Sequence, residues 1–80
     1  MNARKVFVRV LAEFDEQGSL MPVNIAWEDG RKYEIDRVLD VRRAVATKVG
    51  GTAVRYTVSI NGRTTFIFYD DGKWFAQSKQ

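Results

Sequence analysis

The chain has 80 residues, of which 45% are hydrophobic and 29% charged, with a net charge of +3 and neither cysteine nor histidine. This length supports a single domain over residues 1–80 with one hydrophobic core, and it leaves too little chain for a deep cleft between two lobes. The composition excludes disulfides, thiolate nucleophiles, a histidine general base and a zinc site built from cysteine or histidine. We therefore predict that the chain is not an enzyme and holds no metal or other cofactor.

The first apolar stretch begins at Val6, is interrupted by Arg9 and is followed by Glu13. It lacks the uninterrupted apolar core and small-residue cleavage site of a secretory signal. No run approaches the roughly 20 apolar residues that a membrane span requires. These features predict a cytoplasmic protein without membrane contact.

Apolar residues recur at every second position in several segments, which is typical of β-strands. In chain order the alternating sets are Val6, Val8, Val10, Ala12 and Phe14; Val23, Ile25 and Trp27; Val54, Tyr56, Val58 and Ile60; Phe66 and Phe68; with Trp74 in a last strand. Asp29-Gly30, Asn61-Gly62 and Asp71-Gly72 favour type I′ turns, because these residues tolerate positive φ. Gly50-Gly51 indicates a further hairpin turn.

Residues 31–49 admit two interpretations. Tyr33, Ile35 and Leu39 fit alternation, whereas Ile35, Val38 and Leu39 also fit a helical stripe over residues 36–48, with Asp36 as its N-cap. We favour one long, bent strand over the helix. The sequence then predicts an all-β fold, a five- or six-stranded antiparallel meander curled into a small barrel or roll.

Positive charge is concentrated in the middle of the chain. Residues 31–63 hold eight basic and three acidic side chains, a net charge of +5. A basic stripe flanked by aromatic residues on a small β fold could follow a phosphate backbone, and a solvated, ion-paired surface is the simpler interpretation. The candidate nucleic-acid-binding residues are Arg31, Arg42, Arg43, Lys48, Arg55 and Arg63.

A second set of apolar residues falls on the opposite face of the predicted strands. Its members are Phe7, Leu11, Ile67, Tyr69 and Phe75. They are either covered within the monomer or exposed as an interface for a homodimer or another protein. The carboxylate pairs Asp15-Glu16, Glu28-Asp29 and Asp70-Asp71 lie at predicted turns, where acidic residues shape the backbone rather than catalyse.

The segment from Trp27 to Arg42 resembles a group of short uncharacterised bacterial proteins. The likeness continues through Tyr56-Thr57-Val58, Phe66 to Tyr69 and Lys73-Trp74-Phe75, and covers most of residues 5–77. The segment also resembles, more distantly, a domain of unknown function with the pattern Trp-x-Gly-x-x-Tyr-x-Val-x-x-Val-Leu, some members of which lie near genes for lesion-bypass polymerases. The resemblance implies a β fold and adds some support for a nucleic-acid role.

These observations leave two functional hypotheses. The first is a non-enzymatic protein-interaction or accessory module that binds itself or another protein. The second is a nucleic-acid-binding β domain that uses the basic residues of the middle segment. If Arg42, Arg43, Arg55 and Arg63 share one exposed face, the second hypothesis gains support, and if they scatter the first does.

Overall fold

The computed structural model describes residues 3–45 and 52–79, which form eight β-strands and, within those ranges, no helix. The strands are β1 (Ala3–Phe7), β2 (Arg9–Phe14), β3 (Leu20–Ala26), β4 (Lys32–Glu34), β5 (Arg37–Val45), β6 (Thr52–Ile60), β7 (Arg63–Asp70) and β8 (Lys73–Lys79). The all-β class is confirmed. The helical alternative is wrong from Arg37 to Val45, which form β5, while 46–48 and the Gly50-Gly51 turn lie outside the described residues.

Two of the predicted hairpin turns form as the sequence indicates. Asn61 and Gly62 have φ values of 53° and 77°, and Asp71 and Gly72 have φ values of 50° and 77°. Both central residues of each loop are therefore left-handed, as a type I′ turn requires, and the loops join β6 to β7 and β7 to β8. These two loops fix the register of the last three strands.

The Asp29-Gly30 turn is different from the prediction. Only Gly30 is left-handed there, and the connection runs over residues 27–31, closed by a hydrogen bond from the Trp27 N–H to the Arg31 carbonyl at 2.8 Å. The Asp29 carboxylate accepts a hydrogen bond from the Arg31 N–H at 2.9 Å, which stabilises the longer loop. A side chain that bonds its own backbone in this way favours a wider turn over a two-residue one.

Two of the predicted long strands are each divided by a bend, which is why eight strands form in place of five or six. Val8 separates β1 from β2, and Ile35 and Asp36 separate β4 from β5. The Ile35 N–H donates to the Val23 carbonyl in β3 at 3.0 Å, and the Asp36 N–H donates to the Ser59 carbonyl in β6 at 2.7 Å. The second bend is thus bonded to both sheets as the chain crosses between them.

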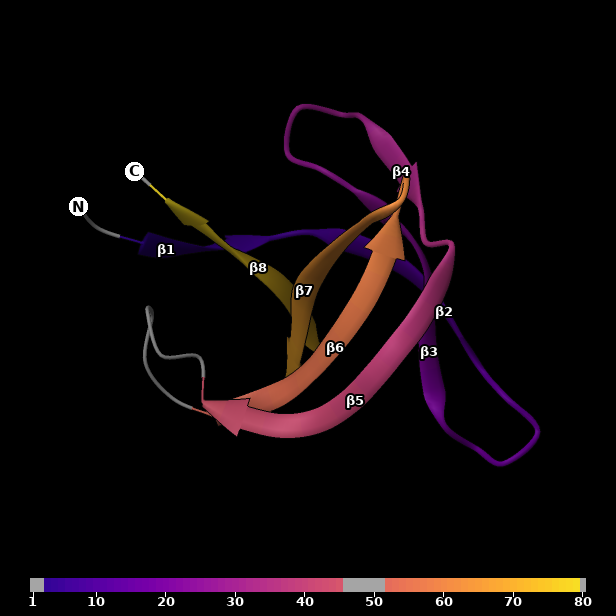
Figure 1. The fold of residues 1–80 in the computed structure, drawn as a ribbon. Helices are drawn as coiled ribbons and strands as arrows, with labels where there is room; N and C mark the ends of the chain where they lie inside the picture. Colours follow the sequence, from indigo (N-terminus) through magenta and orange to yellow (C-terminus); the bar gives the residue numbers. More distant parts are fainter. Residues whose placement is uncertain (1–2, 46–51, 80) are drawn as a thin grey trace.

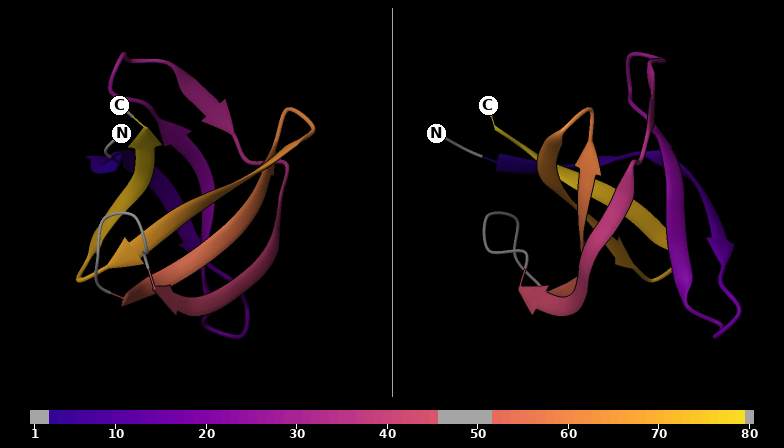
Figure 2. Two further views of the ribbon diagram at one scale, coloured as in Figure 1. Left: turned by 60° about the vertical axis from the view of Figure 1, so that its left-hand side comes forward. Right: turned by 45° about the vertical axis from the view of Figure 1, so that its right-hand side comes forward.

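The strands form two antiparallel sheets (Figure 1). One has five strands in the order β1-β8-β7-β6-β5, and the other has three in the order β2-β3-β4. Neither sheet closes into a barrel, because each takes only part of the two divided strands. Figure 2 shows the strongly curved β5 and β6 on one side of the molecule and the three-stranded sheet across from them.

The main core lies between the two sheets. Its buried members are Ile25 from the three-stranded sheet and Tyr56, Val58 and Ile67 from the five-stranded sheet. A second, smaller cluster of Ala53, Phe68 and Phe75 lies on the opposite face of the five-stranded sheet. A strongly twisted sheet is concave on different faces at different corners, so it can bury residues on both.

Candidate interaction site

Strands β7 and β8 are neighbours for only part of their length. They share three register pairs, Phe68 with Phe75, Tyr69 with Trp74 and Asp70 with Lys73, next to their connecting turn. Beyond Phe75, β8 leaves β7 and continues beside β1 as far as Lys79. Figure 2, left, shows the two strands meeting at the turn and then diverging. The five-stranded sheet is therefore open between the first half of β7 and the second half of β8.

This opening leads into a groove of about 430 Å³, which we call the β7–β8 slot. It is lined by residues of both sheets and of two connecting loops: Ile25, Trp27, Tyr33, Ile60, Asn61, Arg63, Thr65, Phe66, Ile67, Ala76 and Gln77. The lining is mostly apolar and aromatic, with a few polar groups, which is the usual composition of a binding groove.

Thr65 shows how the slot arises. In the register of β6 and β7 it is paired with Val58, which is fully buried, and it precedes buried Ile67 by two positions on the same face. Thr65 is nevertheless exposed. The position faces the interior, but β8 has turned away and no longer covers it. The slot thus opens onto the main core.

Two polar groups distinguish the slot from an ordinary surface hollow. Arg63 is the one charged side chain among the described residues that line it. The side-chain oxygen Oε1 of Gln77 is buried and has no hydrogen-bond partner within the described part of the chain. Buried polar atoms in folded proteins are nearly always hydrogen-bonded, so an acceptor left without a donor beside a groove marks a place where a ligand can donate.

The turn end of the same hairpin is closed by aromatic contacts. The ring centroid of Trp74 lies 4.8 Å from that of Tyr69 and 5.1 Å from that of Tyr56. The Tyr56 hydroxyl donates to the Leu20 carbonyl at 2.7 Å, a bond that joins β6 to β3. Burial, and secondarily the neighbouring Tyr69, raises the pKa of Tyr56 above its ordinary value of 10.0. The tyrosine is therefore a neutral structural link between the sheets.

The five apolar residues predicted as an interface do not share one surface. Ile67 and Phe75 are each only 2% exposed, and they lie on opposite faces of the five-stranded sheet, so monomer burial accounts for both. Tyr69 is half-buried against the main core. Phe7 and Leu11 are exposed, at 57% and 60%, but they belong to different sheets. The prediction that Ile67 and Phe75 share a face is therefore wrong, because alternation within a strand does not show which face of one strand lies beside which face of the next.

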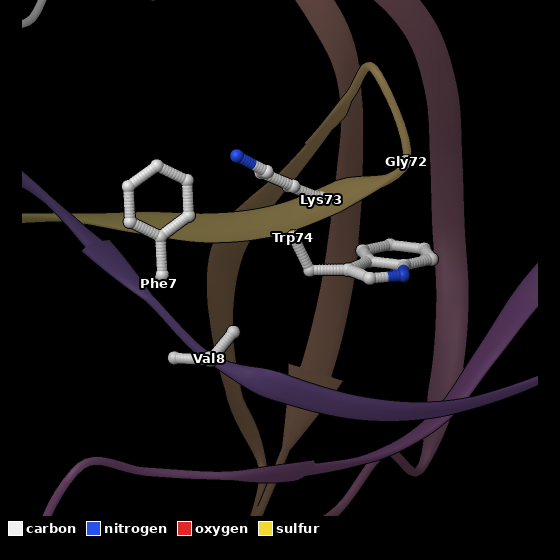
Figure 3. A pocket seen from close by; sticks show the side chains of 5 residues that line it. All are labelled: Phe7, Val8, Gly72, Lys73 and Trp74. Atoms are coloured by element: carbon white, nitrogen blue, oxygen red, sulfur yellow. The ribbon is translucent and has the colours of Figure 1, made fainter.

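Phe7 borders a second hollow of about 380 Å³, together with Val8, Gly72, Lys73 and Trp74 (Figure 3). The Lys73 ammonium lies 5.8 Å from the Phe7 ring centroid, and the Phe7 ring meets the Phe75 ring edge-on at 6.1 Å. In Figure 3 Lys73 extends toward Phe7 while Trp74 turns the other way. These contacts account for the exposed phenylalanine as part of a surface cluster. Among the described residues that line this hollow, no buried side-chain polar atom lacks a hydrogen-bond partner.

The candidate nucleic-acid residues fall on several surfaces. Arg42 and Arg55 are register partners across β5 and β6 and so share a face, whereas Arg43 is paired with Val54 on the other. Arg63 lines the slot, and Arg31 lies in the β3–β4 loop, 3.7 Å from Asp29. Lys48 lies outside the described residues.

Arg42 and Arg55 form a small cluster with Asp40 and Phe66. Arg42 Nε donates to Asp40 Oδ2 at 2.7 Å, and the Arg55 guanidinium lies 4.7 Å from the Phe66 ring centroid. The hydrogen bond from Arg42, reinforced by the charges of Arg42 and Arg55, lowers the pKa of Asp40, and the same bond raises the pKa of Arg42. One acidic group thus offsets part of the positive charge of the pair.

The acidic pairs that the structure describes serve turns, as predicted for Asp15 and Asp29. The Asp15 Oδ1 accepts hydrogen bonds from the Gln17 and Ser19 N–H groups at 2.9 Å each. Within residues 3–45 and 52–79, no group of three or more acidic, histidine or cysteine side chains is placed to hold a metal ion. No helix in these ranges is long and apolar enough to cross a membrane.

No family model, curated protein or solved structure matches this chain. The resemblance to short bacterial proteins therefore stays a prediction. Of the residues that line the slot, the sequence predicted a binding role for Arg63 and Ile67 only. It gave no signal for Thr65, for Gln77 or for the slot that brings them together.

Proposed function

We propose that this chain is a non-enzymatic module that binds a partner polypeptide, and that the β7–β8 slot is its binding site. The observation that carries the proposal is the exposure of Thr65 on the inward face of β7, directly opposite buried Val58. A sheet that is open at this point presents both an apolar interior and unpaired strand edges. Few monomeric proteins leave such an entrance to the core without a use for it.

The lining of the slot has the chemistry of a protein-binding surface. Trp27 lies directly after β3, Tyr33 lies in β4 and Phe66 lies in β7, and all three line the slot. Aromatic side chains and arginine dominate the binding energy of protein interfaces, because they bury large areas while keeping a polar group available. The slot combines these three aromatic residues with Arg63.

The absence of cysteine and histidine supports a role without catalysis. The hydrogen bond between Asp40 and Arg42 explains their shifted pKa values, and burial explains the raised pKa of Tyr56. None of these three groups lines the slot. The lack of cysteine also suits the reducing bacterial cytoplasm, which remains the location that we propose.

The test is a selection of displayed linear peptides on the immobilised wild-type chain, with depletion on Thr65→Tyr. Selected peptides are then synthesised and titrated by calorimetry. Tyrosine at 65 fills the slot, so we expect affinity to fall by at least about tenfold, or ~1.4 kcal/mol. Gln17→Tyr is the control, because Gln17 is exposed in the β2–β3 turn and does not line the slot. It should leave the affinity within about twofold, well under 1.4 kcal/mol.

Two results would contradict the proposal. One is a selection that yields no binding peptide. The other is a set of peptides whose affinity is the same for Thr65→Tyr as for the wild type, since their site would then lie elsewhere. A change in folding is checked by circular dichroism of both variants, which should match the wild type because surface substitutions usually alter stability by less than about 0.5 kcal/mol.

Nucleic-acid binding is the second candidate, supported by one observation: Arg42 and Arg55 adjoin each other, with Phe66 beneath Arg55. Two arginines can neutralise about two phosphates, so the logarithm of the binding constant should fall with the logarithm of salt concentration at a slope near −1.4 for a single strand. The scatter of Arg31, Arg43 and Arg63 supports the interaction module over a phosphate-tracking surface.

Fluorescence anisotropy of labelled single-stranded DNA, duplex DNA and RNA tests this candidate. We expect weak binding at low salt that Arg42→Ala with Arg55→Ala abolishes. A slope much steeper than −1.4 would mean that more basic groups reach the phosphates than the Arg42–Arg55 pair, and would favour nucleic acid as the main partner.

A further inference from the structure

We infer that the partner occupies the β7–β8 slot as an extended strand whose main chain pairs with Thr64 and Phe66 of β7, an inference that rests on the proposed function. Three features of the molecule support this inference: the direction of the main-chain groups of β7, a buried acceptor without a donor, and the difference between this segment and the outer edge of β5.

The register fixes where the main-chain groups of β7 point. Ile60 and Arg63 flank the two-residue turn, so they exchange both hydrogen bonds, and the direction then alternates along the strand. Arg63, Thr65 and Ile67 direct their N–H and C=O groups toward β6. Thr64, Phe66 and Phe68 direct theirs away from β6, toward the β8 side.

Of these three outward-facing residues, only Phe68 has a partner strand. It pairs with Phe75 of β8, and the β7–β8 register ends there. Thr64 and Phe66 therefore present main-chain donors and acceptors at the open side of the slot. Such a row of unpaired groups is what an added strand requires.

Gln77 lies across the opening from this segment. The Val8 N–H bonds the Trp74 carbonyl, so alternation places the main chain of Phe75 and Gln77 on the β7 side of β8. The Gln77 side-chain oxygen is buried without a hydrogen-bond donor among the described residues. A main-chain N–H of an inserted strand, or a side-chain donor that it carries, would supply one.

The long outer edge of β5 provides the contrast. It carries a β-bulge between Val38 and Asp40 and the charged residues Arg37, Arg42 and Arg43. Bulges and charges are the devices by which proteins prevent strand addition at an exposed edge. The open segment of β7 has Thr64, Thr65 and Phe66, which are uncharged and favour strands, and its register with β6 is regular.

The charge of Arg63 and the shape of the slot further restrict the sequence of the partner segment. Arg63 stands at the wide end of the slot, far along β7 from the point where Phe68 meets Phe75. The occupant is therefore an extended, partly apolar segment with an acidic residue or a terminal carboxylate at the end that lies beside Arg63, because arginine and carboxylate form paired, charge-assisted hydrogen bonds.

The test uses the full chain and a synthetic peptide obtained from the selection described above. Amide hydrogen exchange is measured by nuclear magnetic resonance with and without saturating peptide. We expect the Thr64 and Phe66 amides to exchange at least about tenfold more slowly in the complex. N-methylation of alternate peptide amides should weaken binding at least about tenfold in one register and less than about twofold in the other. Arg63→Gln should reduce the affinity for a peptide with the carboxylate and leave that of its amide analogue unchanged.

The outcomes separate the two proposals. If peptides bind in a manner sensitive to Thr65→Tyr but neither the Thr64 nor the Phe66 amide slows, strand pairing is overturned while the slot keeps its function. If no peptide binds, the proposed function fails with it. If both amides slow as the protein concentration rises without peptide, the occupant is a second copy of this chain, and the inference of a separate partner is overturned.

Discussion

The two ends of the β7–β8 hairpin are made of the same two strands and behave differently. At the closed end, residues 68–70 pair with residues 73–75, and the paired rings of Phe68 and Phe75 stack at 5.2 Å. At the open end, residues 63–67 keep their register with β6 but have no register partner in β8. At the closed end the main-chain groups of the two strands are paired and the side chains are packed. At the open end main-chain groups of β7 have no partner in β8, and apolar side chains are accessible.

The difference follows from the path of β8. The short turn forces β8 to begin beside β7, but β8 also pairs with β1 over five residues. A strand has two edges and can pair with a neighbour on each, so the pairing with β1 does not itself exclude β7. Beyond Phe75, however, β8 stays beside β1 and diverges from β7. The proposed binding site thus arises where β8 leaves β7 to remain beside β1, and stability and binding should be separable by substitution.

The largest expected effect is at the closed end. Phe75→Ala removes a ring that is 2% exposed and contacts the rings of Phe7 and Phe68. Such a cavity typically destabilises by about 3–5 kcal/mol, against a total of roughly 4–12 kcal/mol for a domain of this length. Urea unfolding followed by circular dichroism measures the loss.

Phe66→Ala at the open end is the matched comparison. Phe66 is 45% exposed, and its main described contact is the guanidinium of Arg55. An exposed cation–π pair contributes about 0.5–1 kcal/mol, so the loss should be no more than about 1 kcal/mol. Equal losses for the two variants would mean that the open end is as tightly packed as the closed one.

Sequence alone predicted much of the closed end, but of the open end only the Asn61-Gly62 turn and the candidate residues Arg63 and Ile67. Asn-Gly and Asp-Gly dipeptides have a local cause, the tolerance of positive φ, so the two turns and their hairpins could be predicted. The bend at Val8 could not, because the alternation of Val6, Val8 and Val10 continues through it without a glycine or proline. The pairing of β8 with β1 and its separation from β7 beyond Phe75 depend on residues far apart in the sequence, so no local pattern indicates them.

The placement of Arg42 beside Arg55 could not be predicted from the sequence either. Simple alternation along β5 would pair Val41 with Arg55, but the bulge after Val38 shifts the register so that Arg42 takes that place. A bulge moves every later side chain to the other face. The sequence therefore identified the basic residues but could not tell which of them would adjoin.

A further prediction concerns the hydrogen bond that links Tyr56, beside the closed end, to the three-stranded sheet. Tyr56→Phe removes the hydrogen bond to the Leu20 carbonyl and keeps the ring against Trp74. We expect a loss of about 1 kcal/mol at neutral pH. Tyr69→Phe, which loses a hydroxyl without a described hydrogen bond, should change stability by less than about 0.5 kcal/mol.

Tyr56 also predicts a pH dependence. Because its folded-state pKa is raised above 10.0, the folded protein holds this proton when the unfolded chain releases it. Stability is therefore fully present below pH 10 and falls as the pH rises from there toward the folded-state pKa. Tyr56→Phe should show a smaller fall over this range than the wild type. An identical alkaline decline in both proteins would assign it to other groups.

The last prediction concerns amide hydrogen exchange in the free protein and involves no change in global stability. It tests whether the two ends of the hairpin differ in main-chain pairing. Amides of the closed end exchange only when the hairpin opens, whereas an amide without a partner exchanges from the native state. We therefore expect hydrogen exchange to be slow at Phe68, which pairs with Phe75, and fast at Phe66, only two residues earlier in β7. Thr65 is the internal control, since its amide points toward β6 and should be protected like Phe68. Slow exchange at Phe66 in the free chain would show that its main-chain groups are already satisfied, and the open end would then offer a partner its apolar surface but no strand edge.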